Sequence, residues 1–148
     1  MAVALSASLA PWLGAQSISV VRGIDFGTIL TGVTTSIDPR GIGAMEFDIS
    51  GPLGSAGGWS LTLPTVLTRV GGGATMPITF CSTCAVFRIA NNNPAGGVTF
   101  DPAYDVRTLT VLSPLHVYVW IGGSVSPPLQ QMAGSYTGTI VITLAPII

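Results

Sequence analysis

Two cysteines separated by two residues are the clearest candidates for chemistry in the chain. Cys81 and Cys84 form a Cys-Ser-Thr-Cys sequence. A redox site of this kind normally has its first cysteine at a helix N-terminus, but residues 77–80 before it have the pattern of a strand. A tetrahedral zinc site would need two more ligands, and His116 is the only histidine. A tight turn gives the Cα separation of a disulfide, so the spacing favours a Cys81–Cys84 disulfide, with no metal and no cofactor.

The carboxylates and the histidine do not form a catalytic pattern. Glu46 and Asp48 would lie about 7 Å apart on one strand face, which is close to the separation in glycosidase acid pairs. They alternate with the apolar residues Met45, Phe47 and Ile49, which favours instead the solvated face of a half-buried strand. The Gly-x-Ser-x-Gly motif is absent, and a chain without lysine has no P-loop. We therefore expect no enzyme.

Charged residues are scarce. They make up 7% of the chain, against about 25% in an average soluble domain. The five basic residues are all arginines, they are scattered singly, and the net charge is −1. This composition excludes the basic patch of a nucleic-acid-binding protein. A neutral exterior of Ser, Thr, Gly and Asn suits a protein whose neighbours pack close by.

Short alternating runs separated by Gly, Pro and Asn predict an all-β protein. The last run, residues 136–144, is the longest, and it places Ile140, Ile142 and Leu144 on one face. The other expected strands are residues 45–50, 59–63, 77–80, 86–89, 98–100, 108–112 and 115–121. So many short strands in 148 residues favour a β-sandwich or a β-barrel, as a single domain over residues 16–148.

The first 15 residues are apolar and small, and they end in Leu13-Gly14-Ala15 before a polar stretch. This pattern predicts a secretory signal that is cleaved after Ala15, although it lacks a basic n-region and could be truncated. The alternative is a retained β-strand, because apolar residues alternate with small ones at Val3, Leu5, Ala7 and Leu9. At 15 residues the segment is too short to span a bilayer.

Two phrases carry a family resemblance. Residues 25–29 (DFGTI) and 133–144 (AGSYTGTIVITL) resemble a bacterial family of exported β-sandwich domains of unknown function. Agreement in between brings the coverage to about residues 18–145, through the phrases FDISG, WSLTLP and MPITF. The terminal phrase is similar to the last strand of spore-coat-U-like proteins and chaperone-usher pilins, where Gly-x-Tyr precedes alternating apolar residues. Pilins commonly close with an aromatic residue, whereas this chain ends in Pro-Ile-Ile, so recognition by a chaperone is not implied.

The resemblance implies an all-β fold of the immunoglobulin-like, antiparallel β-sandwich type. It also implies a structural subunit of a bacterial cell surface or of a pilus-like filament, exported through the periplasm. We expect it to associate with itself or with other surface subunits through β-strand contacts. The candidate assembly strand contains Tyr136, Ile140, Ile142 and Leu144. The alternative is a secreted carbohydrate- or protein-binding module, in which Trp120, Tyr118 and a loop carboxylate would hold a glycan.

Overall fold

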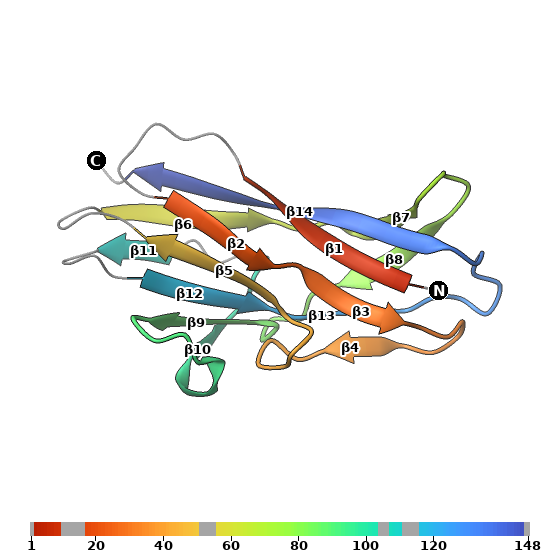
Figure 1. Cartoon of the computed structure of the whole chain (residues 1–148), viewed down its shortest axis with the longest axis horizontal. Coiled ribbons are helices and arrows are strands. Elements are labelled where there is room, and N and C mark those ends of the chain that lie inside the picture. Colours follow the sequence, from red (N-terminus) through yellow and green to blue (C-terminus); the bar gives the residue numbers. More distant parts are fainter. Residues whose placement is uncertain (1, 10–16, 51–55, 104–106, 111–115, 147–148) are drawn as a thin grey trace.

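The computed structural model of the chain describes residues 2–9, 17–50, 56–103, 107–110 and 116–146, which form strands and one short 3₁₀ helix (Figure 1). In chain order the elements are β1 (Ala2–Leu9), β2 (Ser17–Arg22), β3 (Ile24–Thr28), β4 (Thr35–Ile37), β5 (Met45–Ser50), β6 (Ala56–Thr62), β7 (Val66–Arg69), β8 (Thr75–Thr79), β9 (Ala85–Ile89), η1 (Pro94–Gly96), β10 (Val98–Phe100), β11 (Arg107–Thr110), β12 (His116–Ile121), β13 (Gly123–Val125) and β14 (Ser135–Pro146).

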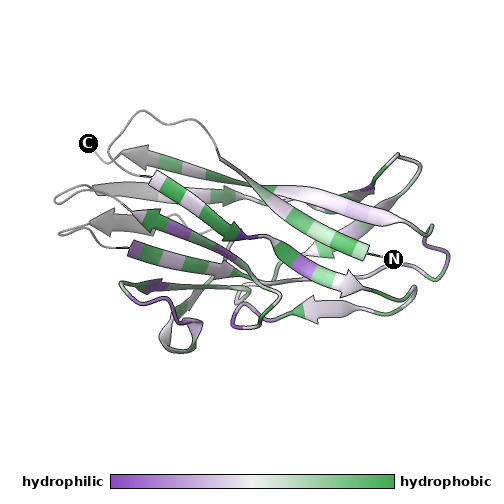
Figure 2. Cartoon of the chain, viewed as in Figure 1, coloured by the Kyte–Doolittle hydropathy of each residue, from purple (hydrophilic) through white to green (hydrophobic). Residues whose placement is uncertain are grey.

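The smaller sheet is antiparallel and has the order β10-β9-β12-β5-β2. Its centre is β12, in which Val119 lies opposite Phe47 of β5 on one side and Phe87 of β9 on the other. Apolar and polar residues alternate along β5 and β12 (Figure 2). One face of each strand therefore turns toward the core, as the period of two requires.

The larger sheet follows the order β11-β6-β14-β7-β8-β13-β4. Strand β1 adds to it by pairing in parallel with β14 and antiparallel with β3. Because β3 in turn lies against β4, the sheet nearly closes into a barrel. The parallel pair β1–β14 joins the two ends of the chain.

One hydrophobic core fills the space between the strands of the two sheets. Trp59 of β6 lies at its centre, with edge-on contacts to Phe47 at 6.2 Å and to Phe100 at 5.2 Å between ring centroids. Each sheet has one face that must be removed from water, and packing the two faces together satisfies both. This arrangement confirms the predicted all-β sandwich-like single domain.

The predicted strands recur with small shifts at their ends, except that residues 111–115 lie outside the described residues. The structure adds β2, β3, β4, β7 and β13, which the alternation had not marked. In the part of the chain that the structure describes, no helix has the length and apolar character needed to cross a membrane.

Candidate functional site

Strand β14, the candidate assembly strand, pairs with other strands on both of its sides. On one side it pairs with β1, and on the other with β7 near its start and β6 near its end. The side chains of the four candidate residues are all buried: Tyr136, Ile140, Ile142 and Leu144. Their role in assembly stays a prediction, whereas their burial shows that they belong to the hydrophobic core.

Tyr136 also fixes the loop that precedes β14. Its hydroxyl donates a hydrogen bond to the Met132 carbonyl oxygen at 2.5 Å and accepts one from the Gln131 amide nitrogen at 2.6 Å. Gln131 in turn donates to the Thr75 carbonyl oxygen at 3.1 Å. A buried phenol needs such partners, because an unsatisfied hydroxyl is costly in the core.

Strand β1 occupies a groove whose shape depends on two glycines. Val3 and Leu5 of β1 are buried, and Leu5 lies against Gly138 of β14 and Gly23 beside β3. A Cβ atom at Gly138 would come within 2.8 Å of Leu5 Cδ1, and one at Gly23 would overlap the Leu5 carbonyl oxygen. The groove between β3 and β14 therefore fits an extended strand with a large apolar residue at this position.

The N-terminal segment thus takes the conformation of the retained-strand alternative. Val3, Leu5 and Ala7 turn toward the core, as that alternative predicted. Cleavage after Ala15 stays a prediction, because that position lies outside the described residues. If it occurs, it removes a strand on which both β14 and β3 depend for backbone partners.

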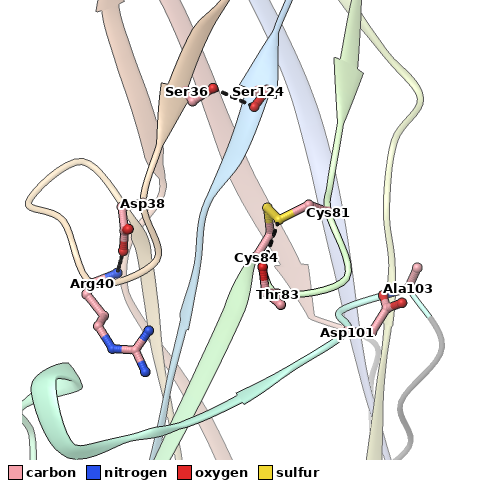
Figure 3. The surroundings of a disulfide bond; sticks show 9 residues. All are labelled: Ser36, Asp38, Arg40, Cys81, Thr83, Cys84, Asp101, Ala103 and Ser124. Carbon is pink, nitrogen blue, oxygen red and sulfur yellow. Dashed lines mark hydrogen bonds between the residues drawn. A yellow bond between two sulfur atoms is a disulfide. The ribbon is translucent and has the colours of Figure 1, made fainter.

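The two cysteines form a disulfide at the end of a strand (Figure 3). Their Cα atoms lie 4.9 Å apart, and the Cys84 backbone N–H donates to the Cys81 carbonyl oxygen at 3.1 Å, as in a tight turn. Cys84 is buried and Cys81 is exposed. The disulfide spans only four residues, so it closes the turn between β8 and β9.

A groove of about 540 Å³ with both polar and apolar lining residues runs beside the disulfide. Its walls come from β4, β10, β13, the turn after β4 and the cysteine turn. Ser36 and Ser124, which are opposite each other on the paired strands β4 and β13, share a hydrogen bond of 2.7 Å in its wall. The Arg40 guanidinium donates to the Gly97 carbonyl oxygen at 3.2 Å and to Thr99 Oγ1 at 3.3 Å. Within the described ranges no three His, Cys, Asp or Glu residues are grouped to hold a metal.

The outer face of β5 and β12 differs from the solvated face that the alternation predicted. Glu46 is only 4% exposed, and its carboxylate lies 3.3 Å from the guanidinium of Arg22 on β2. Asp48 is half-buried and lies 2.6 Å from His116 Nδ1. The prediction of a solvated face is therefore wrong for Glu46, because the neighbouring edge strand supplies an arginine that covers it.

The aromatic residues proposed for a glycan lie on the same face. His116, Tyr118 and Trp120 stack in sequence, with centroid separations of 5.8 and 6.2 Å. Trp120 is only 1% exposed, so its ring has no free face for a sugar. Tyr118 is half-buried and His116 is exposed. Reasoning from the sequence missed this burial, because alternation predicts the face of a strand and not what covers it.

No protein-family model matches the chain, and no curated protein matches its sequence. The resemblance to exported bacterial β-sandwich domains therefore stays a hypothesis that rests on residues 25–29 and 133–144.

Proposed function

We propose that this protein is a structural subunit of a bacterial cell surface or surface filament, and that its subunits assemble by exchanging a β-strand. The observation that supports this most directly is the position of β1. An N-terminal strand fills a groove between β3 and β14, and residues 10–16 separate it from the rest of the domain. A strand tied to its domain by one connecting segment can be replaced by the same strand of a neighbour without any new contact having to be made.

The groove between β3 and β14 would provide both the affinity for an exchanged β1 strand and the register in which it binds. All eight residues of β1 pair in parallel with β14, from Ala2 opposite Ser135 to Leu9 opposite Ile142. Burying Val3 and Leu5 contributes roughly 1.5 to 3 kcal/mol each. A vacant groove would expose this apolar surface and the unpaired backbone groups of β3 and β14, so an empty subunit would be prone to capture another strand. In this proposal β14 receives the exchanged strand.

The scarcity of charge is consistent with such packing. A net charge of −1 produces little repulsion between copies. The proposal places the protein outside the cytoplasm, where its Cys81–Cys84 disulfide would persist.

A cross-linking experiment tests the exchange. Ala4 and Thr137 are exposed and lie opposite each other in the β1–β14 register. In the variant Ala4→Cys/Thr137→Cys, oxidation should link β1 of one subunit to β14 of another and give a ladder of oligomers on non-reducing gels. The control is Thr68→Cys/Thr75→Cys, an exposed pair across β7 and β8 that stays within one subunit. It should give monomers only.

A variant that forms its β1–β14 cross-link only within single chains, at every protein concentration, would contradict the exchange. Failure of both pairs to oxidise would instead contradict the strand registers themselves. The two outcomes separate an incorrect function from an incorrect fold.

The alternative function, a carbohydrate- or protein-binding module, is favoured by a different observation. The groove beside the disulfide is lined by serine hydroxyls from β4 and β13 and by threonines of the cysteine turn and β10, although Trp120 is too buried to contribute a sugar-stacking surface. Ser124→Leu should abolish glycan binding by this groove, while Ser19→Leu, on the exposed part of β2, should leave it unchanged. A wild-type protein that binds no glycan in an array would remove this alternative.

A further inference from the structure

The Cys81–Cys84 disulfide lies on the turn that carries the chain from one sheet to the other (Figure 3). Strand β8 before the turn belongs to the larger sheet, and β9 after it belongs to the smaller sheet. The two cysteines differ in exposure, because Cys81 is exposed whereas Cys84, next to the start of β9, is only 7% exposed. A reagent in the solvent therefore has readier access to Cys81 than to Cys84.

The groove beside the disulfide provides the path to Cys81. Both cysteines and Thr83 line it, and its volume of about 540 Å³ lies in the range of sites that hold small molecules. In thiol–disulfide exchange a thiolate attacks one sulfur of the bond, and the other sulfur leaves as a thiolate. The difference in exposure makes Cys81 the attacked sulfur and Cys84 the leaving group.

A hydroxyl group next to Cys81 favours its later release as a thiolate. Thr83 Oγ1 lies 3.5 Å from Cys81 Sγ. A disulfide sulfur carries no hydrogen, so the hydroxyl is the donor in this contact. The same donor stabilises a thiolate at Cys81 more strongly, because hydrogen bonds to a charged acceptor are the stronger ones.

The turn keeps other contacts that do not depend on the disulfide. The Cys84 N–H donates to the Cys81 carbonyl oxygen at 3.1 Å, and the Cys84 carbonyl oxygen accepts from the Gly122 N–H at 2.8 Å. Beyond the turn, β9 pairs with β12 on one side and with β10 on the other. So short a disulfide loop constrains the unfolded chain only weakly. We therefore expect the domain to stay folded when the bond opens.

We infer that Cys81 and Cys84 form a thiol–disulfide exchange site, which a dithiol from the solvent reduces while the domain stays folded. Because Cys81 follows a strand and does not begin a helix, the site lacks the activated thiolate of a catalytic redox motif and is the substrate of the exchange. The inference does not rest on the exchange of β1, because this groove shares no residue with β1, β3 or β14.

The reaction has two steps. In the first, a thiolate of the dithiol attacks Cys81 Sγ, a mixed disulfide forms there, and Cys84 leaves as a thiolate that takes up a proton. In the second, the other thiolate of the dithiol attacks its own sulfur in the mixed disulfide, and Cys81 leaves as a thiolate. Two electrons pass to the cysteine pair, and the dithiol becomes a disulfide.

Reduction of the full chain without denaturant tests this inference. The protein is treated with dithiothreitol as a small dithiol, or with reduced thioredoxin as a protein dithiol, and its free thiols are then alkylated and counted by mass. We expect both cysteines to be alkylated while the circular dichroism spectrum stays unchanged, and comparison of the two reagents shows which source of dithiol the groove admits. Reduction by neither reagent unless denaturant is present, or loss of the β-sheet signal on reduction, would overturn the inference.

Two matched variants test which sulfur is attacked. Cys84→Ser leaves an exposed thiol and Cys81→Ser leaves a buried one, and both lack the disulfide. With oxidised glutathione, Cys84→Ser should form its mixed disulfide about tenfold faster or more. Adding Thr83→Val to Cys84→Ser should slow this reaction, whereas adding Ser82→Ala, at an exposed neighbour, should not.

A thermal melt checks that each variant is folded. If either cysteine variant melts early, peptide mapping instead locates the mixed disulfide that the wild-type protein forms with reduced glutathione, which we expect at Cys81. Equal rates for the two cysteine variants, or a mixed disulfide at Cys84, would contradict the inferred order of attack.

Discussion

Truncation of one side chain on β14 tests the central packing of the domain. Ile142 is fully buried and lies opposite Leu61 of β6, in the core that also contains Phe47 and Val119. Ile142→Ala removes its apolar surface and leaves a cavity, which typically costs about 2 to 5 kcal/mol. This loss is large, because the total free energy of unfolding of a native protein is only about 5 to 15 kcal/mol. In a domain of 148 residues we expect the thermal midpoint to fall by roughly 4 to 20 °C.

The neighbouring residue provides the control. Thr143 points to the opposite face of β14, is half-buried and lies opposite Ser60. Thr143→Ala should change the free energy of unfolding by no more than about 0.5 kcal/mol. Circular dichroism melts and urea titrations of both variants measure the difference. A loss for Thr143→Ala as large as that for Ile142→Ala would refute the assignment of faces, and with it the register of β14 against β6.

Three further outcomes are expected. Thiol titration of the denatured, unreduced protein should find no free thiol, and the protein should contain no stoichiometric zinc. Reduction of the Cys81–Cys84 bond should lower the free energy of unfolding by only about 2 kcal/mol, because the loop is short. Two free thiols with bound zinc would contradict this. The two interpretations of the N-terminal segment give different intact masses for the exported protein: cleavage after Ala15 gives a chain that begins at Gln16, whereas the exchange of β1 proposed above requires a mass that includes residues 2–9. Gly138→Ala should lower the free energy of unfolding by about 1 to 3 kcal/mol, because its Cβ crowds Leu67 and Leu5. If the stability loss of the double variant Leu5→Ala/Gly138→Ala equals the sum of the losses of the two single variants, β1 does not lie against Gly138 as the structure has it.

Much of the strand pattern could be predicted because its physical cause is local. A half-buried strand alternates apolar and polar residues, so Phe47 and Ile49 on β5, and Ile140 and Ile142 on β14, mark their strands without reference to the rest of the chain. The disulfide could be predicted for the same reason, since two cysteines three positions apart need only one turn to meet.

Strands without a local pattern were missed. Strand β13 has three residues, one of them Gly123, and β4 also has three, which is too short for a period of two to be visible. The burial of Glu46 depends on Arg22, which is 24 positions earlier in the sequence and becomes a neighbour only when β2 pairs with β5. The parallel contact of β1 with β14 joins the two chain ends, and no turn between them signals it.

The N-terminal segment shows why one pattern supported two predictions. A signal segment and a buried strand both need small and apolar residues, and the alternation of Val3 and Leu5 with small residues is compatible with either. Both predictions concern the groove between β3 and β14. If residues 1–15 stay, β1 fills the space between β3 and β14 and can be exchanged with a neighbour. If they are removed, the edges of both strands and the space beside Gly138 and Gly23 are left open, and the domain needs a strand from another chain. The intact mass therefore separates the two cases: a chain that keeps residues 2–9 can exchange β1 with a neighbour, whereas a chain that begins at Gln16 would need a strand other than β1 in the same groove.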